Sequence, residues 1–316
     1  MTITSRDMSR TPNMEFAHID LATPYFADWS MDSVQIDNGE TLSTVRVLDL
    51  DGLNILHNSE SHSLVHNWRL DPGKTAFSFF ARDMTEGSWC GFEVGAGDFL
   101  VATDRRDHFA KTPARFEQVV LTIDTDLLEA WGALPSRLGS RAFADGSGVL
   151  RLPPSGRRLT SFLFALMAPR GLTVCDTNEE LKTEILSMLR GALRDTDEGN
   201  TYRAEPPRSG GHAAVRRAMQ AMKSNTRLVH ASDLAQELSM SPRALELAFK
   251  REVGVSPHQF MRWYRLQNVR LALLNARAGS DLIKQIARAN GFSDLGRFAG
   301  YYQQAYGELP SDTLLR

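Results

Sequence analysis

The chain has 316 residues and a net charge of −2, with 42% hydrophobic and 23% charged residues. This length allows two domains with separate cores, and the composition excludes a largely disordered or fibrous protein. No apolar run reaches the roughly 18 residues of a membrane span, and the N-terminus has no hydrophobic stretch, so we predict neither a membrane helix nor a secretory signal.

The two cysteines, Cys90 and Cys175, are far apart in the sequence and neither lies in a spacing typical of metal ligands. They argue against a disulfide framework and against structural zinc, and they favour a reducing compartment. We therefore expect a cytoplasmic protein without a metal, a cofactor or a membrane partner.

The charge is unevenly distributed between the two parts of the chain. Residues 212–316 contain 15 Lys and Arg against 8 Asp and Glu, a net charge of +7, whereas residues 1–211 carry a net charge of −9. A compact basic segment indicates a polyanionic partner, although chance segregation of solvated charges gives the same count.

The N-terminal part shows the periodicity of strands after a polar arm of about twenty residues. Between residues 41 and 124, apolar residues tend to alternate with polar ones, as in 44–50, 75–81 and 116–124, with Gly, Asp and Pro between the runs. Short strands separated by turns predict a cupin-like barrel or a sandwich.

Two helices are predicted next, at residues 156–167 and 178–193. In the second helix Leu181, Ile185 and Leu189 lie on one face, which favours either a dimer seam or packing onto the helix's own domain. Strands followed by helices predict an α+β protein.

A breaker-rich stretch that includes the letters EPPRSGG separates this part from the rest of the chain. It predicts three segments: an effector-binding or dimerisation domain at 1–195, a linker at 196–211 and an all-helical domain at 212–316.

Paired arginines follow one of the predicted strands. Arg105 and Arg106 have the chemistry to clamp a phosphorylated or carboxylate ligand, with a nucleotide second messenger as one candidate class, but the flanking aspartates equally suit a self-neutralised loop. Trp68 and Trp89 are candidates for the core or for the lining of a ligand pocket.

Three histidines, His57, His62 and His66, raise the question of a metal site. Their spacing does not match the HxH pattern of cupin enzymes, and no carboxylate follows at the usual interval. We therefore interpret them as surface or core residues and predict no metal.

The C-terminal part contains an internal duplication. Residues 234–257 and 286–310 repeat one pattern, and Phe249 matches Tyr302 at an offset of 53. The pattern is that of a helix-turn-helix: a short helix with a small inner alanine, a tight turn and a capped second helix.

The start signals of the second helices support this interpretation. Ser241 is a predicted N-cap with Pro242 in the first helical position, and Ser256 begins the next helix in the same way. Ser293, followed by Asp294, repeats the signal in the second copy.

The second helix of the first copy separates its faces at 100° per residue. Leu245 and Phe249 point to the predicted core. Four residues share the opposite face: Arg243, Glu246, Leu247 and Lys250. In a major groove, arginine can pair with guanine, glutamate can accept from cytosine and leucine can contact a thymine methyl, whereas a surface helix merely solvates such residues.

The corresponding face of the second copy is poorer in side chains. Gly296 and Gly300 offer nothing to a base, so Arg297 and Gln303 are its candidate DNA contacts. We expect the first copy to read the bases and the second mainly to hold the DNA backbone.

A long helix is predicted between the copies, at residues 257–274. It is stiff enough to present the two units to successive major grooves. Its arginines Arg262, Arg265 and Arg270 either contact phosphates or form salt bridges onto the helical pairs, and we expect Arg265 to be structural.

These motifs resemble the DNA-binding domain of the AraC/XylS family over about a hundred residues, a span of the size expected for two adjacent helix-turn-helix units. The matching stretches are SPRALELAFKREVGVSP, the spaced residues of 265–273, IARANGF and FAGYYQQAYGELP, and the stretch 291–302 is similar to that of ethanolamine-operon-type regulators. Leu247 and Gly300 stand where many members have basic residues, so base contacts at these positions are not carried over.

The resemblance implies a transcription regulator, usually an activator, that binds promoter DNA and contacts RNA polymerase. By analogy, the N-terminal domain is expected to bind a small-molecule effector and to form a homodimer. The alternatives are a cupin-type metal enzyme fused to a DNA-binding module, and a DNA-binding protein that needs no ligand.

Overall fold

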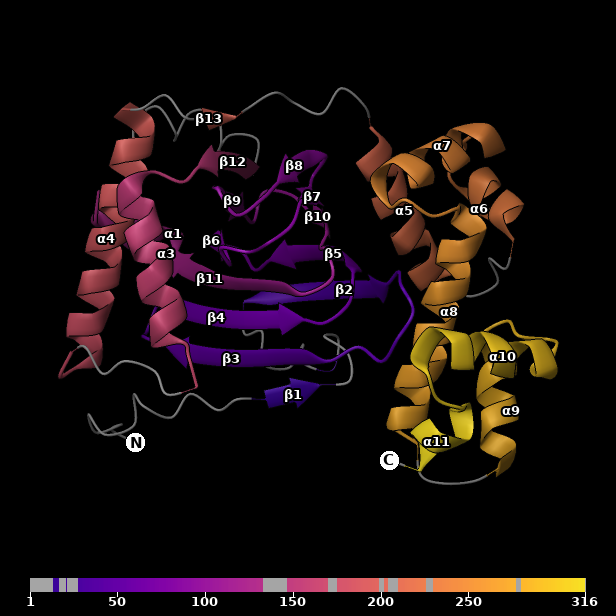
Figure 1. The fold of residues 1–316 in the computed structure, drawn as a ribbon. Coiled ribbons are helices and arrows are strands. Elements are labelled where there is room, and N and C mark those ends of the chain that lie inside the picture. Colours follow the sequence, from indigo (N-terminus) through magenta and orange to yellow (C-terminus); the bar gives the residue numbers. More distant parts are fainter. Residues whose placement is uncertain are drawn as a thin grey trace.

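The computed structural model describes residues 14–16, 21, 28–132, 147–169, 175–198, 202–203, 210–225, 230–276 and 280–315. Its N-terminal part consists of strands with helices along one side, and its described residues after 210 form helices joined by short connections (Figure 1). The predicted α+β class is confirmed.

The described strands form two sheets, and every strand pairing in them is antiparallel. The strands are β1 (Met14–Phe16), β2 (Trp29–Gln35), β3 (Ser43–Asp49), β4 (Leu53–Glu60), β5 (Leu64–Leu70), β6 (Lys74–Phe80), β7 (Gly87–Trp89), β8 (Phe92–Val94), β9 (Asp98–Thr103), β10 (His108–Lys111), β11 (Phe116–Asp124), β12 (Ser147–Arg151) and β13 (Tyr202–Arg203). The larger sheet has the order β1-β3-β4-β11-β6-β9-β12-β13, and the smaller has the order β2-β5-β10-β7-β8. The strands predicted at 44–50, 75–81 and 116–124 are β3, β6 and β11.

Strand β11 shows how the larger sheet is buried on both faces. Val119, Leu121 and Ile123 belong to the core that lies under the helices. Val120, one residue along, belongs to the core shared with the smaller sheet, and Gln118 lies on the same side. Side chains of a strand alternate between its faces, so apolar residues in succession are what a doubly covered strand requires.

Three helices accompany the sheets among the described residues: α1 (Thr125–Ala130), α3 (Pro154–Leu166) and α4 (Asn178–Glu198). Helices α3 and α4 pack side by side along one side of the larger sheet (Figure 1). In α4, Leu181, Ile185 and Leu189 are buried in the core beneath these helices. The apolar stripe therefore packs onto its own domain, and the interpretation of it as a dimer seam was wrong.

The segment predicted as a linker at 196–211 starts within a helix. Helix α4 continues to Glu198 because Thr196 is still buried and its hydroxyl donates to the Ala192 carbonyl (2.8 Å). Strand β13 then pairs with β12 before the next helix begins at Gly211.

The C-terminal domain consists of α5 (Gly211–Ser224), α6 (Ala231–Glu237), α7 (Pro242–Glu252), α8 (Pro257–Leu274), α9 (Ser280–Ala289), α10 (Leu295–Tyr306) and α11 (Pro310–Leu314). Helix α8 runs through its middle, with α5 to α7 at one end and α9 to α11 at the other (Figure 1). Among the helices described, none has the length and apolar character needed to cross a bilayer.

The two domains touch along β2, β10 and the segment after β2. Two ion pairs join them to α5: Lys223 Nζ to Asp32 Oδ1 (2.6 Å) and Arg216 Nη1 to Asp107 Oδ2 (2.5 Å). The backbone N–H of Gly39 also donates to the Ala305 carbonyl of α10 (2.8 Å). The N-terminal domain thus contacts the first helix of the C-terminal domain and the second helix of the second unit.

Candidate DNA interface and interior cavity

Helices α6 and α7 form the first helix-turn-helix. The turn between them contains Ser239 in the left-handed region (φ 53°), and the small Ala235 is buried where the helices meet. Ser241 then caps α7, since its hydroxyl accepts a hydrogen bond from the Ala244 N–H (3.2 Å), and Pro242 occupies the first turn. The predicted cap and turn are confirmed.

The outward face of α7 is open to solvent. Arg243, Glu246 and Lys250 are exposed, and none of them makes an ion pair within the described part of the chain. Leu247 is 61% exposed. On the inner face, Leu245 is buried as predicted. This face can therefore enter a groove without first breaking internal contacts.

Helices α9 and α10 form the second unit. Here Asp294 caps the helix, because its carboxylate accepts hydrogen bonds from the N–H groups of Gly296 (3.1 Å) and Arg297 (3.0 Å). The cap predicted at Ser293 thus lies one residue later, which is the position that corresponds to Ser241 once the offset of 53 is applied.

The outward face of α10 is also exposed but carries fewer polar and charged side chains. Gly296 and Gly300 are exposed, and Gln303 is an exposed side chain near the end of the helix. Arg297 is exposed as well, with its Nε 3.4 Å from the Asp294 carboxylate. Such an exposed pair contributes little to stability, so the guanidinium remains available to an anion.

The arginines of α8 fasten this helix to the second unit. Arg262 lies over the Tyr301 ring (4.5 Å to the centroid), and Arg265 lies over the Phe292 ring (5.5 Å). Burial and the nearby Arg262 lower the pKa of Arg265. Arg270 is fully buried and its Nη1 donates to Glu308 (2.6 Å). The structure thus favours the structural alternative for these arginines.

A cavity lies between the two sheets, with a mainly apolar lining. Trp68 and Trp89 belong to that lining, and Trp68 stacks between Trp29 (5.0 Å between centroids) and His108 (4.2 Å). Burial lowers the pKa of His108 to about 4, so its ring is neutral near pH 7. The tryptophans are thus both core and lining.

The cavity has one polar end, formed by β4, β5 and the residue after β10. The Thr112 hydroxyl donates to Glu60 Oε2 (2.9 Å), and His66 Nε2 lies 3.3 Å from the same oxygen. Asn58 Nδ2 donates to Glu60 Oε1 (3.3 Å). Lys111 also lines the cavity, but its Nζ lies beside Gly254 of the C-terminal domain.

Comparisons with known proteins concern the helical domain most directly. A family described as a helix-turn-helix domain matches residues 234–316. The "XylDLEGF operon transcriptional activator" of Pseudomonas putida is 38% identical over 107 residues, which make up 34% of this chain and 33% of that protein. The "XylDLEGF operon transcriptional activator 2" of Pseudomonas putida is 37% identical over 105 residues, 33% of this chain and 67% of that protein. The chain belongs to the AraC/XylS family.

The chain thus spans about a third of the length of the first of these AraC/XylS relatives. The solved structure of "the AraC-like transcriptional activator CuxR" superposes with a TM-score of 0.43 at 12% identity, and the match covers 87% of this chain and 99% of that one. The similarity to ethanolamine-operon-type regulators within the AraC/XylS family stays a prediction.

The predicted arginine clamp does not reach the cavity of this AraC/XylS protein. Arg105 is exposed in the turn between β9 and β10, and neither Arg105 nor Arg106 belongs to the cavity lining. The reason is the neighbouring Asp107, which pairs with Arg216 of α5 and holds the loop against the helical domain. The loop is an anchor between domains.

The three histidines have separate partners. His57 Nε2 bonds Glu117 (2.7 Å), which lowers the pKa of that carboxyl, and His62 Nδ1 bonds the Ser61 hydroxyl (2.8 Å). Within the described ranges, no group of three or more His, Cys, Asp or Glu residues is placed to hold a metal ion.

The sequence did not single out Glu60 and Thr112, and it indicated His66 as a surface or core residue without placing it in a cavity. The available signal was a glutamate that ends one strand and a histidine inside the next. A buried carboxylate is costly unless it is paired, so such a residue on a strand of a doubly covered sheet is a reason to expect a polar site.

Proposed function

We propose that this chain is a transcription activator that binds promoter DNA through its C-terminal domain and responds to a small molecule held between its two sheets. The observation that carries the proposal is the outward face of α7, where Arg243, Glu246 and Lys250 are exposed on a capped second helix of a helix-turn-helix. Membership of the AraC/XylS family supports it.

The two units have unequal roles in this proposal. Helix α7 reads bases through Arg243, Glu246, Leu247 and Lys250, because these side chains project from the face opposite the buried core. Helix α10 mainly holds phosphates, with Arg297 and Gln303 as its contacts. Helix α8 keeps the units apart, so that they enter grooves about one turn (~34 Å) apart.

The cavity is the proposed effector site. It is concave, mainly apolar and supplied with a few polar groups at one end, which are the usual features of a small-molecule site. Its polar end argues against the phosphorylated class of effector, because Glu60 is there and the arginine pair is not. A homodimer that acts in the cytoplasm and contacts RNA polymerase completes the proposal.

Selection of binding sites from random DNA by the full-length chain, at moderate salt, tests the DNA-binding part. We expect enrichment of a defined motif, in which Arg243→Ala relaxes the preference at one base position. Absence of any enriched motif, with broad protection in footprints and a steep dependence on salt, contradicts the proposal and indicates an architectural DNA-binding protein instead.

A further inference from the structure

The cavity between the sheets has mainly apolar walls and a carboxylate at one end. Its walls carry indole and phenyl rings from both sheets, including Trp29, Trp68 and Phe116, whereas the Glu60 carboxylate stands at one end. Glu60 is only 2% exposed. A ligand that fills this space must therefore have an apolar body and a polar group that reaches a carboxylate.

The charge at that end is negative and weakly compensated. The ion-pair partner of Glu60 in the described part of the chain is His66, at 3.3 Å, and the remaining donors, Thr112 and Asn58, are neutral. The amine of Lys111 is directed to Gly254. Since a buried carboxylate is costly without a close cation, the site gains from a positive ligand and repels a negative one.

A second acceptor lies on Asn58, another residue of the cavity lining. Asn58 is 4% exposed, and while its Nδ2 donates to Glu60, its Oδ1 is buried and has no hydrogen-bond partner among the described residues. An unpaired buried acceptor costs free energy that a donor from a ligand recovers. Two acceptors on adjacent side chains are suited to one group with several N–H bonds.

We propose that the cavity binds a small organic amine in its ammonium form, carried on an apolar or aromatic body, with N–H donors directed to Glu60 and Asn58. This inference rests on the proposed function, since it names the chemical class of the effector in the same cavity.

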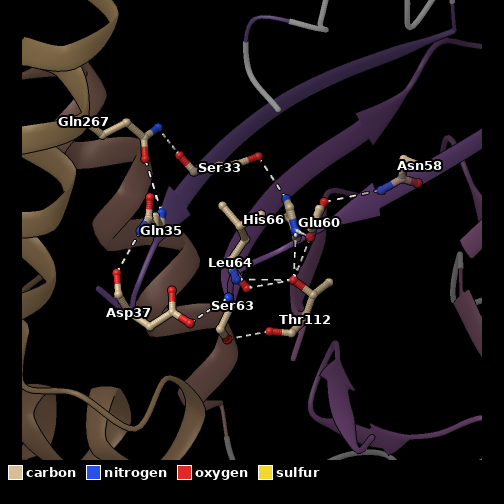
Figure 2. Close-up of polar contacts among 10 residues, drawn as sticks. All are labelled: Ser33, Gln35, Asp37, Asn58, Glu60, Ser63, Leu64, His66, Thr112 and Gln267. Carbon is tan, nitrogen blue, oxygen red and sulfur yellow. Dashed lines mark hydrogen bonds and ion pairs between the residues drawn. The ribbon is translucent and has the colours of Figure 1, made fainter. Parts of the chain in front are cut away.

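The same residues connect the cavity to the helical domain. Figure 2 shows the path from Glu60 through His66 and Ser33 to Gln267 of α8. His66 Nδ1 lies 2.9 Å from the Ser33 hydroxyl, the Gln267 amide donates to the Ser33 carbonyl, and the Gln35 N–H donates to Gln267 Oε1 (3.3 Å). Each of these groups is buried.

This path gives the ammonium a way to act on DNA binding. An ammonium at Glu60 competes with His66 for the carboxylate, so the hydrogen bond between His66 and Ser33 changes when the ligand binds. Ser33 belongs to β2, and Gln267 of α8, the helix between the two units, forms hydrogen bonds to this strand. Occupancy of the cavity is thereby transmitted to α8.

Three probes with one body and different heads test the class: 3-phenylpropylamine, 3-phenylpropanol and 3-phenylpropionate. With the full-length chain near neutral pH, calorimetric titration and thermal shift should show the amine binding at least ~10-fold more tightly than the alcohol and the carboxylate, a difference of ~1.4 kcal/mol or more. Glu60→Gln should remove this preference. The matched control Glu117→Gln changes a carboxylate of the same sheet outside the cavity and should preserve it.

The outcomes separate this inference from the proposed function. Tighter binding of the carboxylate probe overturns the ammonium class and leaves a ligand-responsive regulator intact, and so does an amine preference that survives in Glu60→Gln. If no probe binds while the chain still selects a DNA motif, the ammonium class fails alone. Gln267→Met should still bind the amine but should lose the amine's effect on DNA affinity, and an unchanged effect contradicts the path through Ser33.

Discussion

The two helix-turn-helix units share a frame, meaning the same pattern of capping and buried residues, and they differ in their outward-facing side chains. Each has a capped second helix, through Ser241 in one and Asp294 in the other, and each buries an aromatic ring at the matching position, Phe249 or Tyr302. Their outward faces differ, because α7 carries charged side chains where α10 carries glycines. The residues that build each unit are separate from those that we propose to read DNA, so a copy can lack the proposed reading residues and keep its fold.

The largest expected effect concerns the frame of the first unit. Phe249→Ala removes a fully buried ring that packs against Phe260 (5.2 Å between centroids), and we expect the helical domain to lose about 3–5 kcal/mol of unfolding free energy. Chemical denaturation of the full chain measures this loss. The control Leu247→Ala, on the exposed face, should change stability by less than ~0.5 kcal/mol. Similar losses in the two variants contradict the assignment of inner and outer faces.

The next effect concerns base reading. Arg243→Ala should weaken binding to the selected DNA site by about 1–3 kcal/mol and relax the preference at one base position, because a bidentate contact to a base edge is lost. Titrations on the selected site and on its single-base variants measure both quantities. Arg158→Ala, an exposed arginine on α3, is the matched control and should leave them unchanged. A base preference that survives in Arg243→Ala contradicts the role of α7 as the reader.

A smaller effect of opposite sign is expected in α10. Gly300→Ala should stabilise the helical domain by up to ~1 kcal/mol, because alanine favours helix and a Cβ at this position meets no atom within 4 Å. Thermal unfolding measures the gain. Base preference should not change, since glycine supplies no reading group. A loss of DNA affinity would indicate instead that the backbone of α10 approaches the DNA closely.

The smallest expected effect is on DNA affinity through the proposed phosphate contact of α10. Arg297→Ala should weaken binding about equally for all DNA sequences and should reduce the slope of log affinity against log salt by about 1, as expected for one lost phosphate contact. Binding at several salt concentrations measures the slope. A change in base preference contradicts the proposed division between the two units.

The sequence predicted the features that depend on local rules. Strands such as β3 follow from period-two runs and breakers, and the Ser241 and Ser256 caps follow from the serine–proline pairs at the starts of their helices. The cap at Asp294 was displaced by one residue because Ser293 and Asp294 are both good caps, and only the position of the added residue decides between them.

The cavity could not be predicted from the sequence because the residues that form it are far apart in the chain. Glu60 and Thr112 are separated by 52 positions, and Ser33 and Gln267 by 234, so no spacing rule brings them together. Arg105 and Arg106 lie outside the cavity lining, in a loop whose Asp107 pairs with Arg216 of α5, and such a contact between domains cannot be read from local pattern. Their role as a ligand clamp stays a prediction.

The two-sided burial of β11 has a consequence for how new effector preferences arise. Odd-numbered residues such as Val119 and Leu121 support the layer under α3 and α4, while Gln118 and Val120 belong to the opposite face, where Gln118 borders the cavity. A substitution at Gln118 can therefore change the shape of the cavity without changing the core beneath the helices. In this one strand, substitutions on one face alter the proposed effector site, whereas substitutions on the other face alter the stability of the core beneath the helices.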